Sequence, residues 1–307
     1  MSSLHKRLTK RALRPAFSLV EQRLLRGAHR MDQPLRSDLD ALRQEVEEMR
    51  RRQYALGLLV DSTGRGTHRA PTPAAIDALV REIQGVGPGG EHARRSVVVA
   101  YRTVVAMEAL GVGRLAGSTS NVCGKLATIP LLSPPNGSIL EIGTLYGLFA
   151  AALLRMVHRA GLEPDLTIVD PLAGSQLQPG TRSGADPTGA PVREDVVRAN
   201  LALCGSRSGL SARIEQGFSR DPEVRDAVSD REYGVIVVDG DHSEEGVRAD
   251  LEWVEKIVAP GGIVVLDDYG DKKWPGVQDA LDAHLAGGGS RLRMLGRVST
   301  SGYLRAD

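Results

Sequence analysis

Two short apolar segments, residues 235–238 and 263–266, give the clearest structural signal in the chain. Both are rich in β-branched residues without polar interruption, which is typical of strands covered on both faces. Between them, apolar residues such as Val247 and Leu251 recur at helical spacing, and residues 260–262 (Pro-Gly-Gly) are expected to end that helix. A helix that connects two such strands implies that they pair in parallel.

The same alternation of strand and helix extends over much of the chain. Further strand-like segments occur at residues 138–142, 166–169 and 212–215, each followed by helix-spaced apolar residues. Residues 292–298 and 302–304 are expected to form a closing antiparallel hairpin. Strands that alternate with helices predict an α/β fold with a doubly wound, mostly parallel, Rossmann-like sheet.

Acidic residues follow both strands of the first pair. Asp239 comes directly after one strand, and Asp267 and Asp268 come directly after the other. Because parallel strands end at the same edge of a sheet and neighbouring strands lie roughly 4.8 Å apart, we expect three carboxylates and His242 to meet there. Open α/β sheets bind ligands at this edge. Like charges this close repel unless a cation or donor compensates them, so the cluster predicts a functional site.

The N-terminal region is predicted to form a helical arm outside the sheet. Residues 1–30 are rich in Lys and Arg and carry one narrow apolar face. Such a basic helix would lie on an anionic membrane, on an acidic partner or on its own dimer mate. In residues 35–60, apolar residues alternate spacings of four and three, interrupted only by Gln53. This pattern predicts a coiled coil and a homo-oligomer, or alternatively an amphipathic helix packed on its own domain.

The pattern divides the chain into four regions. Residues 1–60 form the arm, residues 61–73 a polar linker, residues 74–132 a helical cap and residues 133–307 the α/β domain. Residues 172–191 form a long loop rich in Gly and Pro. A loop of this length is unusual in a compact domain, so it is expected to be functional or mobile.

Composition narrows the class of protein. The 307 residues are 41% hydrophobic and 25% charged, as in an ordinary globular protein, and the net charge of +1 gives no general argument for nucleic-acid binding. The two cysteines are too few for a disulfide framework or a cysteine-based zinc site. No apolar run approaches the ~20 residues of a membrane span. The basic N-terminus lacks the apolar core of a signal peptide, so a cytoplasmic protein is predicted.

A glycine-containing turn follows the first strand of the sheet. Glu141, Gly143 and Gly147 have the spacing E-x-G-x-x-x-G, in which glycine allows a tight turn and a close approach to a ligand. The spacing differs from the dinucleotide fingerprint G-x-G-x-x-G. Glu141 would repel a pyrophosphate but would accept a cationic or hydroxylated ligand. Asp170, at the end of the next strand, is placed to accept hydrogen bonds from ribose hydroxyls.

Four segments together resemble class I S-adenosylmethionine-dependent methyltransferases. They are ILEIGTLYG, IVDP, IEQGFS and the run from VVDGDHSEEGV to LDDYG. More narrowly, they are similar to the metal-dependent O-methyltransferases that include catechol, caffeoyl-CoA and macrolide-sugar enzymes, and the last run is closest to the sugar and antibiotic-tailoring branch. The resemblance covers about residues 119–286. It implies that residues 133–307 form a methyltransferase domain.

The resemblance implies where S-adenosylmethionine would bind. The turn after the first strand would lie under the methionine moiety, the acid after the second strand would hold the ribose, and residues 216–219 would lie beside the adenine. The cofactor-binding residues implied in this way are Glu141, Gly143, Thr144, Tyr146, Gly147, Asp170, Gln216, Gly217, Ser219 and Asp239.

The resemblance also implies a divalent cation, Mg²⁺ or another, on Asp239, Asp267 and Asp268. Hard oxygen ligands suit Mg²⁺, which keeps waters that a substrate diol can displace. The ion would lower the pKa of a hydroxyl and align it with the sulfonium methyl. His242, with an ordinary pKa of about 6.5, would be the general base, or alternatively a hydrogen-bonding residue at the helix start. Asp241 is predicted to cap that helix.

The sequence therefore predicts an Mg²⁺-assisted O-methyltransferase that acts on a hydroxyl of a sugar, glycoside or related natural product. Two alternatives stay open. One is a metal-independent methyltransferase of the same fold with another acceptor. The other is a catalytically silent methyltransferase-like scaffold that its coiled coil oligomerises. No motif identifies the acceptor.

Overall fold

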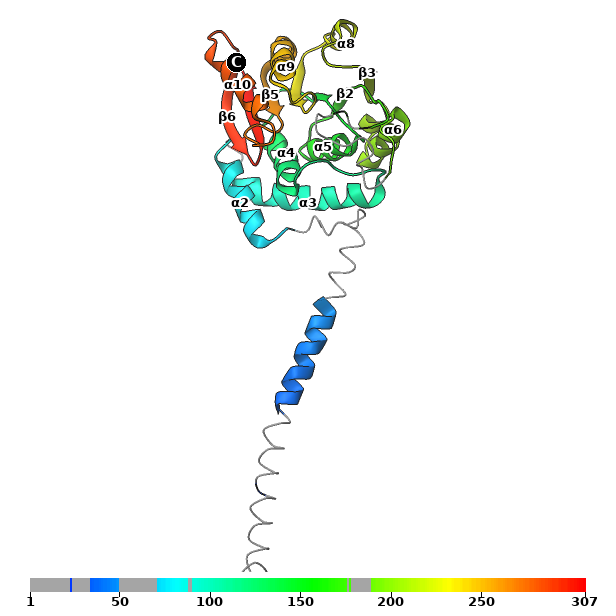
Figure 1. Cartoon of the computed structure of the whole chain (residues 1–307), viewed down its shortest axis with the longest axis vertical. Helices are drawn as coiled ribbons and strands as arrows, with labels where there is room; N and C mark the ends of the chain where they lie inside the picture. The colour runs from blue at the N-terminus through cyan, green and yellow to red at the C-terminus, as the bar shows by residue number, and fades with distance from the viewer. Residues whose placement is uncertain (1–22, 24–33, 50–70, 88–89, 176, 178–188) are drawn as a thin grey trace, which may run out of the picture. The chain divides into compact units, whose positions relative to one another are not determined.

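A computed structural model of the chain describes residues 23, 34–49, 71–87, 90–175, 177 and 189–307 (Figure 1). The chain divides into two compact units, Met1–Leu56 and Gly57–Asp307. In the first unit, residues 34–49 are helical and exposed. The predicted basic helix of residues 1–30, apart from Arg23, lies outside the described residues. The same is true of residues 50–60 of the predicted coiled coil and of most of the linker.

The second unit is built on a seven-stranded sheet. Its strands are β1 (Ser138–Ile142), β2 (Asp165–Asp170), β3 (Arg213–Gln216), β4 (Tyr233–Val238), β5 (Val258–Leu266), β6 (Leu292–Val298) and β7 (Ser301–Ala306). They lie in the order β3-β2-β1-β4-β5-β7-β6. The first five pair in parallel, and β7 pairs antiparallel with both β5 and β6. The predicted Rossmann-like sheet with a C-terminal antiparallel hairpin is confirmed.

Helices cover both faces of this sheet (Figure 1). They are α2 (Pro73–Gln84), α3 (Ala93–Leu110), α4 (Thr119–Leu131), α5 (Leu148–Arg159), α6 (Glu194–Leu201), α7 (Arg207–Leu210), α8 (Pro222–Val228), α9 (Glu244–Ile257) and α10 (Pro275–Ala286), with 3₁₀ turns at Gly90–His92 and Ala202–Cys204. One apolar core lies between the sheet and α2–α6, and the other lies between the sheet and α8–α10. Successive strand residues alternate between these cores, for example Val237 and Val238, which explains why the strands carry no polar interruption.

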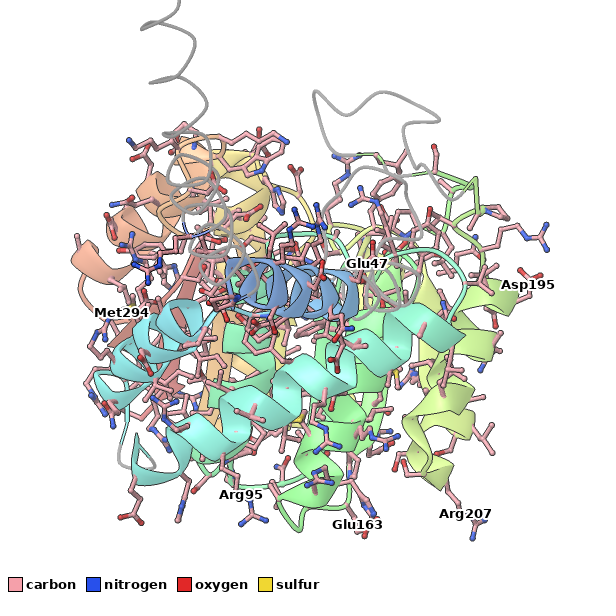
Figure 2. The ribbon with its side chains drawn as sticks, turned by 90° about the horizontal axis from the view of Figure 1, so that it is seen from below. Glu47, Arg95, Glu163, Asp195, Arg207 and Met294 are labelled. Atoms are coloured by element: carbon pink, nitrogen blue, oxygen red, sulfur yellow. The ribbon has the colours of Figure 1, made fainter. Side chains whose placement is uncertain are left out.

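The helices predicted as a cap belong to the same compact unit as the sheet. Helix α3 buries Val97 and Val104 and exposes Arg95, which points outward in Figure 2, as do the exposed Glu163 and Arg207. Helix α4 differs because residues 121–129 are all buried. A helix that is buried on all sides serves the interior of the protein rather than its surface.

Two details of the α9 region differ from the sequence prediction. Residues 260–262 do not end the helix, because α9 ends at Ile257 and these residues lie inside β5. Val258 pairs with Tyr233, and a register shift between Tyr233 and Val235 accommodates the extra residues. The N-cap is Ser243, whose hydroxyl accepts the Gly246 N–H. Asp241, the predicted cap, instead accepts the N–H of Ser243 at 2.9 Å, in the turn that precedes the helix.

The described helices give no sign of a membrane span. Among them, none is both long enough and apolar enough to cross a bilayer.

Candidate active site

The carboxyl ends of the central strands meet as the sequence predicts. Val238 is the register partner of both Ile142 and Leu266. The ladder continues one residue further, because Asp239 N–H donates to Ile142 O at 2.8 Å and Asp267 N–H donates to Val238 O at 2.9 Å. The predicted turn and the predicted acid cluster therefore lie at one edge of the sheet.

Gly143 makes the closest approach at this edge. Its φ is +83°, and a Cβ placed on it would lie 2.1 Å from the backbone oxygen of Asp239. Glycine is needed here both for the left-handed backbone and for the space that a side chain would take. Besides allowing the tight turn that the sequence predicts, this glycine therefore lets the ends of β1 and β4 lie close together.

We expect Gly143→Ala to lower the free energy of unfolding by about 2–5 kcal/mol, from the left-handed backbone and the overpacking together. Gly261→Ala is a matched control, since Gly261 has a φ of +75° with nothing within 4 Å of its added Cβ. The control should cost about 1–2 kcal/mol, which is the backbone cost alone. Urea unfolding measures both, and equal losses in the two variants would contradict the close approach.

Asp170 is buried at the end of β2 and organises the turn beside it. Its Oδ2 accepts the backbone N–H groups of Thr144 at 2.7 Å and Leu145 at 3.2 Å, and its Oδ1 accepts that of Leu172 at 2.8 Å. These bonds hold the turn after β1 against the end of β2. The same carboxylate lines the cavity described below.

Glu141 is buried in β1 beneath this turn. Burial, together with the nearby charges of Asp239 and Asp170, raises the pKa of Glu141 to about 8, although the hydrogen bond from Thr144 Oγ1 opposes the rise. A bound ligand with positive charge or hydrogen-bond donors would lower this pKa again, because it would favour the ionised form of Glu141.

The three predicted metal ligands lie together, and a lysine joins them. Lys125 of α4 is buried, forms an ion pair with Asp267 Oδ2, and has its Nζ 3.6 Å from Asp239 Oδ2. Burial lowers the pKa of Lys125, but the charges of Asp267 and Asp239 outweigh it and hold this pKa above its ordinary value. Burial and the charge of Asp267 raise the pKa of Asp268 to about 7.

The triad does not fit the metal site that the sequence predicts. Besides Lys125, Asp267 receives two neutral donors on Oδ1, Asn121 Nδ2 at 2.8 Å and Ser301 Oγ at 2.8 Å. Its acceptor positions are therefore largely taken by the protein itself. Within the described parts of the chain, no group of three His, Cys, Asp or Glu side chains is arranged to hold a metal ion. The cation beside Asp239 and Asp267 is the Lys125 ammonium.

His242 is held between two of the acids. Its Nε2 lies 3.3 Å from Asp239 Oδ1, its Nδ1 lies 3.4 Å from Asp268 Oδ2, and its ring packs edge-on against Trp274 with centroids 4.9 Å apart. Burial lowers the pKa of His242, but the hydrogen bond to Asp239 and the charges of both acids raise it above its ordinary value. The ring is thus fixed in place and flanked by groups that stabilise its protonated form.

A cavity of about 730 Å³ lies over this edge of the sheet. Predicted site residues that line it are Glu141, Gly143, Thr144, Asp170, Gly217, Ser219, Asp239, His242, Asp267 and Asp268. Three others do not line it. The hydroxyl of Tyr146 donates to Ala190 O at 3.0 Å, Gln216 Nε2 donates to Pro171 O at 3.2 Å, and Gly147 is the N-cap of α5. These three support the walls of the cavity instead of facing into it.

Sequence reasoning missed Lys125 and Asn121. Both lie on α4, more than one hundred residues before Asp267, so no local motif connects them to the site. One signal was present, because Lys125 is the only charged residue in an otherwise uncharged helical segment, Thr119–Leu131. A charge in such a helix is buried with a partner or serves a site.

Known proteins give two kinds of match. The O-methyltransferase NovP is 19% identical, with 71% of this chain and 99% of NovP covered and a TM-score of 0.49. TomG, an O-methyltransferase of tomaymycin synthesis from Streptomyces achromogenes, is 16% identical (68% and 90% covered, TM-score 0.44), and CalS11, a TDP-rhamnose 3'-O-methyltransferase of calicheamicin biosynthesis, is 17% identical (77% and 96% covered, TM-score 0.40). No curated protein sequence matches significantly. Residues 140–269, which contain the turn, Asp170 and the acid cluster, match the family model described as "Methyltransferase domain". The segment that builds this sheet edge is similar to methyltransferase domains.

Proposed function

We propose that the protein is an S-adenosylmethionine-dependent O-methyltransferase that methylates a hydroxyl of a sugar, glycoside or related natural product. The observation that carries this proposal is one cavity lined on one side by Glu141 and Asp170 and on the other by His242 among the acids. The methyltransferase-domain match spans the same residues.

The two sides of the cavity suit the two reactants. Glu141 and Asp170 offer carboxylates to a cationic methionine moiety and to ribose hydroxyls, and Gly143 leaves the turn open to a close ligand. Gly217 and Ser219 lie where the adenine would be placed, beside the end of β3. The cofactor's sulfonium would then face the acid cluster, where the acceptor hydroxyl would lie.

Methyl transfer to a hydroxyl requires alignment and one proton acceptor. The O–CH₃ bond would form as the S–CH₃ bond breaks, and the electron pair of the broken bond would stay on sulfur. The products would be the methyl ether, S-adenosylhomocysteine and the hydroxyl proton, which must be taken up by a base. We assign this proton to His242, whose ring is fixed by Asp239 and Asp268. Once protonated, the imidazolium would lie between two carboxylates, which favours the transfer.

The direct test is methyl transfer itself. The purified protein is incubated with S-adenosylmethionine that carries a labelled methyl group and with separate panels of sugars, glycosides and phenols. We expect the label on a hydroxyl oxygen of a sugar or glycoside, located by mass spectrometry and NMR. Label on nitrogen or carbon acceptors alone would contradict the proposal.

We also propose that the helix at residues 34–49 pairs with a second copy of the chain. Its seam residues Leu35, Leu39, Leu42, Val46 and Met49 are exposed. Their spacing of four and three residues is that of a coiled-coil seam. An identical helix packed against this row would bury the exposed apolar side chains of both copies.

Replacing both Leu39 and Leu42 with Lys should convert the oligomer to a single chain, because charges at seam positions cannot be buried between helices. Light scattering coupled to size exclusion measures the mass. Ser37→Lys, at an exposed position off the seam, is the matched control and should keep the wild-type mass. A wild-type mass equal to one chain would contradict the pairing.

A further inference from the structure

Lys125 brings a positive charge into the acid cluster from a distant part of the chain. Its side chain is only 3% exposed, and its Nζ contacts Asp267 Oδ2 and lies 3.6 Å from Asp239 Oδ2. The ammonium also lies 4.8 Å from the centre of the Phe149 ring, whose face attracts a cation. This charge is therefore held between the ends of β4 and β5.

The position is one that a bound cation would occupy. A Mg²⁺ ion lies roughly 2.1 Å from its carboxylate oxygens. An ion shared by Asp239 Oδ2 and Asp267 Oδ2 would be forced against the Lys125 ammonium, which already contacts one of these oxygens. Asp267 Oδ1 gives no alternative, because Asn121 and Ser301 donate to it.

We propose that the Lys125 ammonium takes the place of the divalent cation at Asp239 and Asp267, so that the protein excludes Mg²⁺ from this cluster and carries its own cation. Lys125 is then a positioning residue. It holds one oxygen of Asp239 while the other lies against His242 Nε2, and so it fixes the ring through the carboxylate.

The exclusion of metal rests on geometry alone, whereas the effect on His242 rests on the proposed function. The two parts can be tested separately. A metal titration does not depend on methyl transfer, so loss of the proposed activity and loss of this inference are distinct results.

The experiment is a titration of EDTA-treated protein with Mn²⁺, in which the EPR signal of free Mn²⁺ measures binding. The wild type should bind no Mn²⁺ below about 1 mM. Lys125→Met removes the ammonium at similar length and should bind one Mn²⁺ per chain at least tenfold more tightly than the wild type. Lys256→Met removes the same charge from an exposed position of α9 and should behave as the wild type.

Two results would overturn the inference. One is a wild-type protein that binds Mn²⁺ with micromolar affinity, and the other is a folded Lys125→Met variant that gains no affinity. Circular dichroism checks the fold of the variant, and Lys125→Gln provides a second neutral side chain. The wild-type titration still shows whether the acid cluster excludes a divalent cation, even where both variants fail to fold.

Discussion

Replacement of His242 by Gln should lower kcat about 10²- to 10⁴-fold, which is the usual contribution of a general base. Glutamine can still donate a hydrogen bond to a neighbouring carboxylate, but it cannot take up the hydroxyl proton. The affinity of the variant for S-adenosylmethionine should remain at the wild-type value, because His242 lies on the side of the cavity that we propose for the acceptor and is not among the residues assigned to the cofactor.

Steady-state kinetics with the acceptor found by the labelling experiment measures this loss. His284→Gln is the matched control, since His284 is also mostly buried, is hydrogen-bonded to a carboxylate of Glu255 at 2.9 Å, and does not line the cavity. The control should keep its kcat. A His242→Gln variant with wild-type kcat would refute the role of the ring as base.

Replacement of Asp170 by Asn should weaken S-adenosylmethionine binding about ten- to a hundredfold. The amide has one oxygen where the carboxylate has two, so its NH₂ group must face backbone N–H groups of Leu172 or of Thr144 and Leu145. An unsatisfied buried donor costs about 1–3 kcal/mol, and we expect the turn after β1 to shift in order to relieve it. Each 1.4 kcal/mol of binding free energy lost through the displaced turn corresponds to a tenfold change in affinity. The variant also loses an acceptor for the ribose.

Calorimetric titration compares this variant with Asp165→Asn, which lies at the exposed opposite end of the same strand and pairs with Arg231. The control should bind the cofactor like the wild type. Equal affinity of Asp170→Asn and Asp165→Asn would show that the end of β2 does not hold the ribose.

The central strands were predictable because their signal is local. The segments that form β1, β4 and β5 are apolar and β-branched, and the acids that follow them must share an edge once the strands pair in parallel. The end of α9 was not predictable in this way. Pro260 and the two glycines after it are typical of a helix end, but β5 already begins at Val258, which pairs with Tyr233, and runs through these three residues.

The sequence predicts the acidic residues of the candidate site but not the positive charge that lies among them. Sequence places Asp239, Asp267 and Asp268 together, and charge repulsion then requires a compensating group. It does not say which group, because Lys125 reaches the cluster only through the packing of α4 against the sheet. Asp267, expected as a metal ligand, is instead bonded to two side chains of that helix.

The central claim is that the cavity at the carboxyl edge binds S-adenosylmethionine. Calorimetric titration of the full-length protein tests it most directly. We expect one site per chain with a Kd on the order of 1–100 µM, within the usual range of enzyme substrates, and competition by S-adenosylhomocysteine. Absence of binding by either compound to the folded protein would contradict the account and would leave the silent scaffold as the better description.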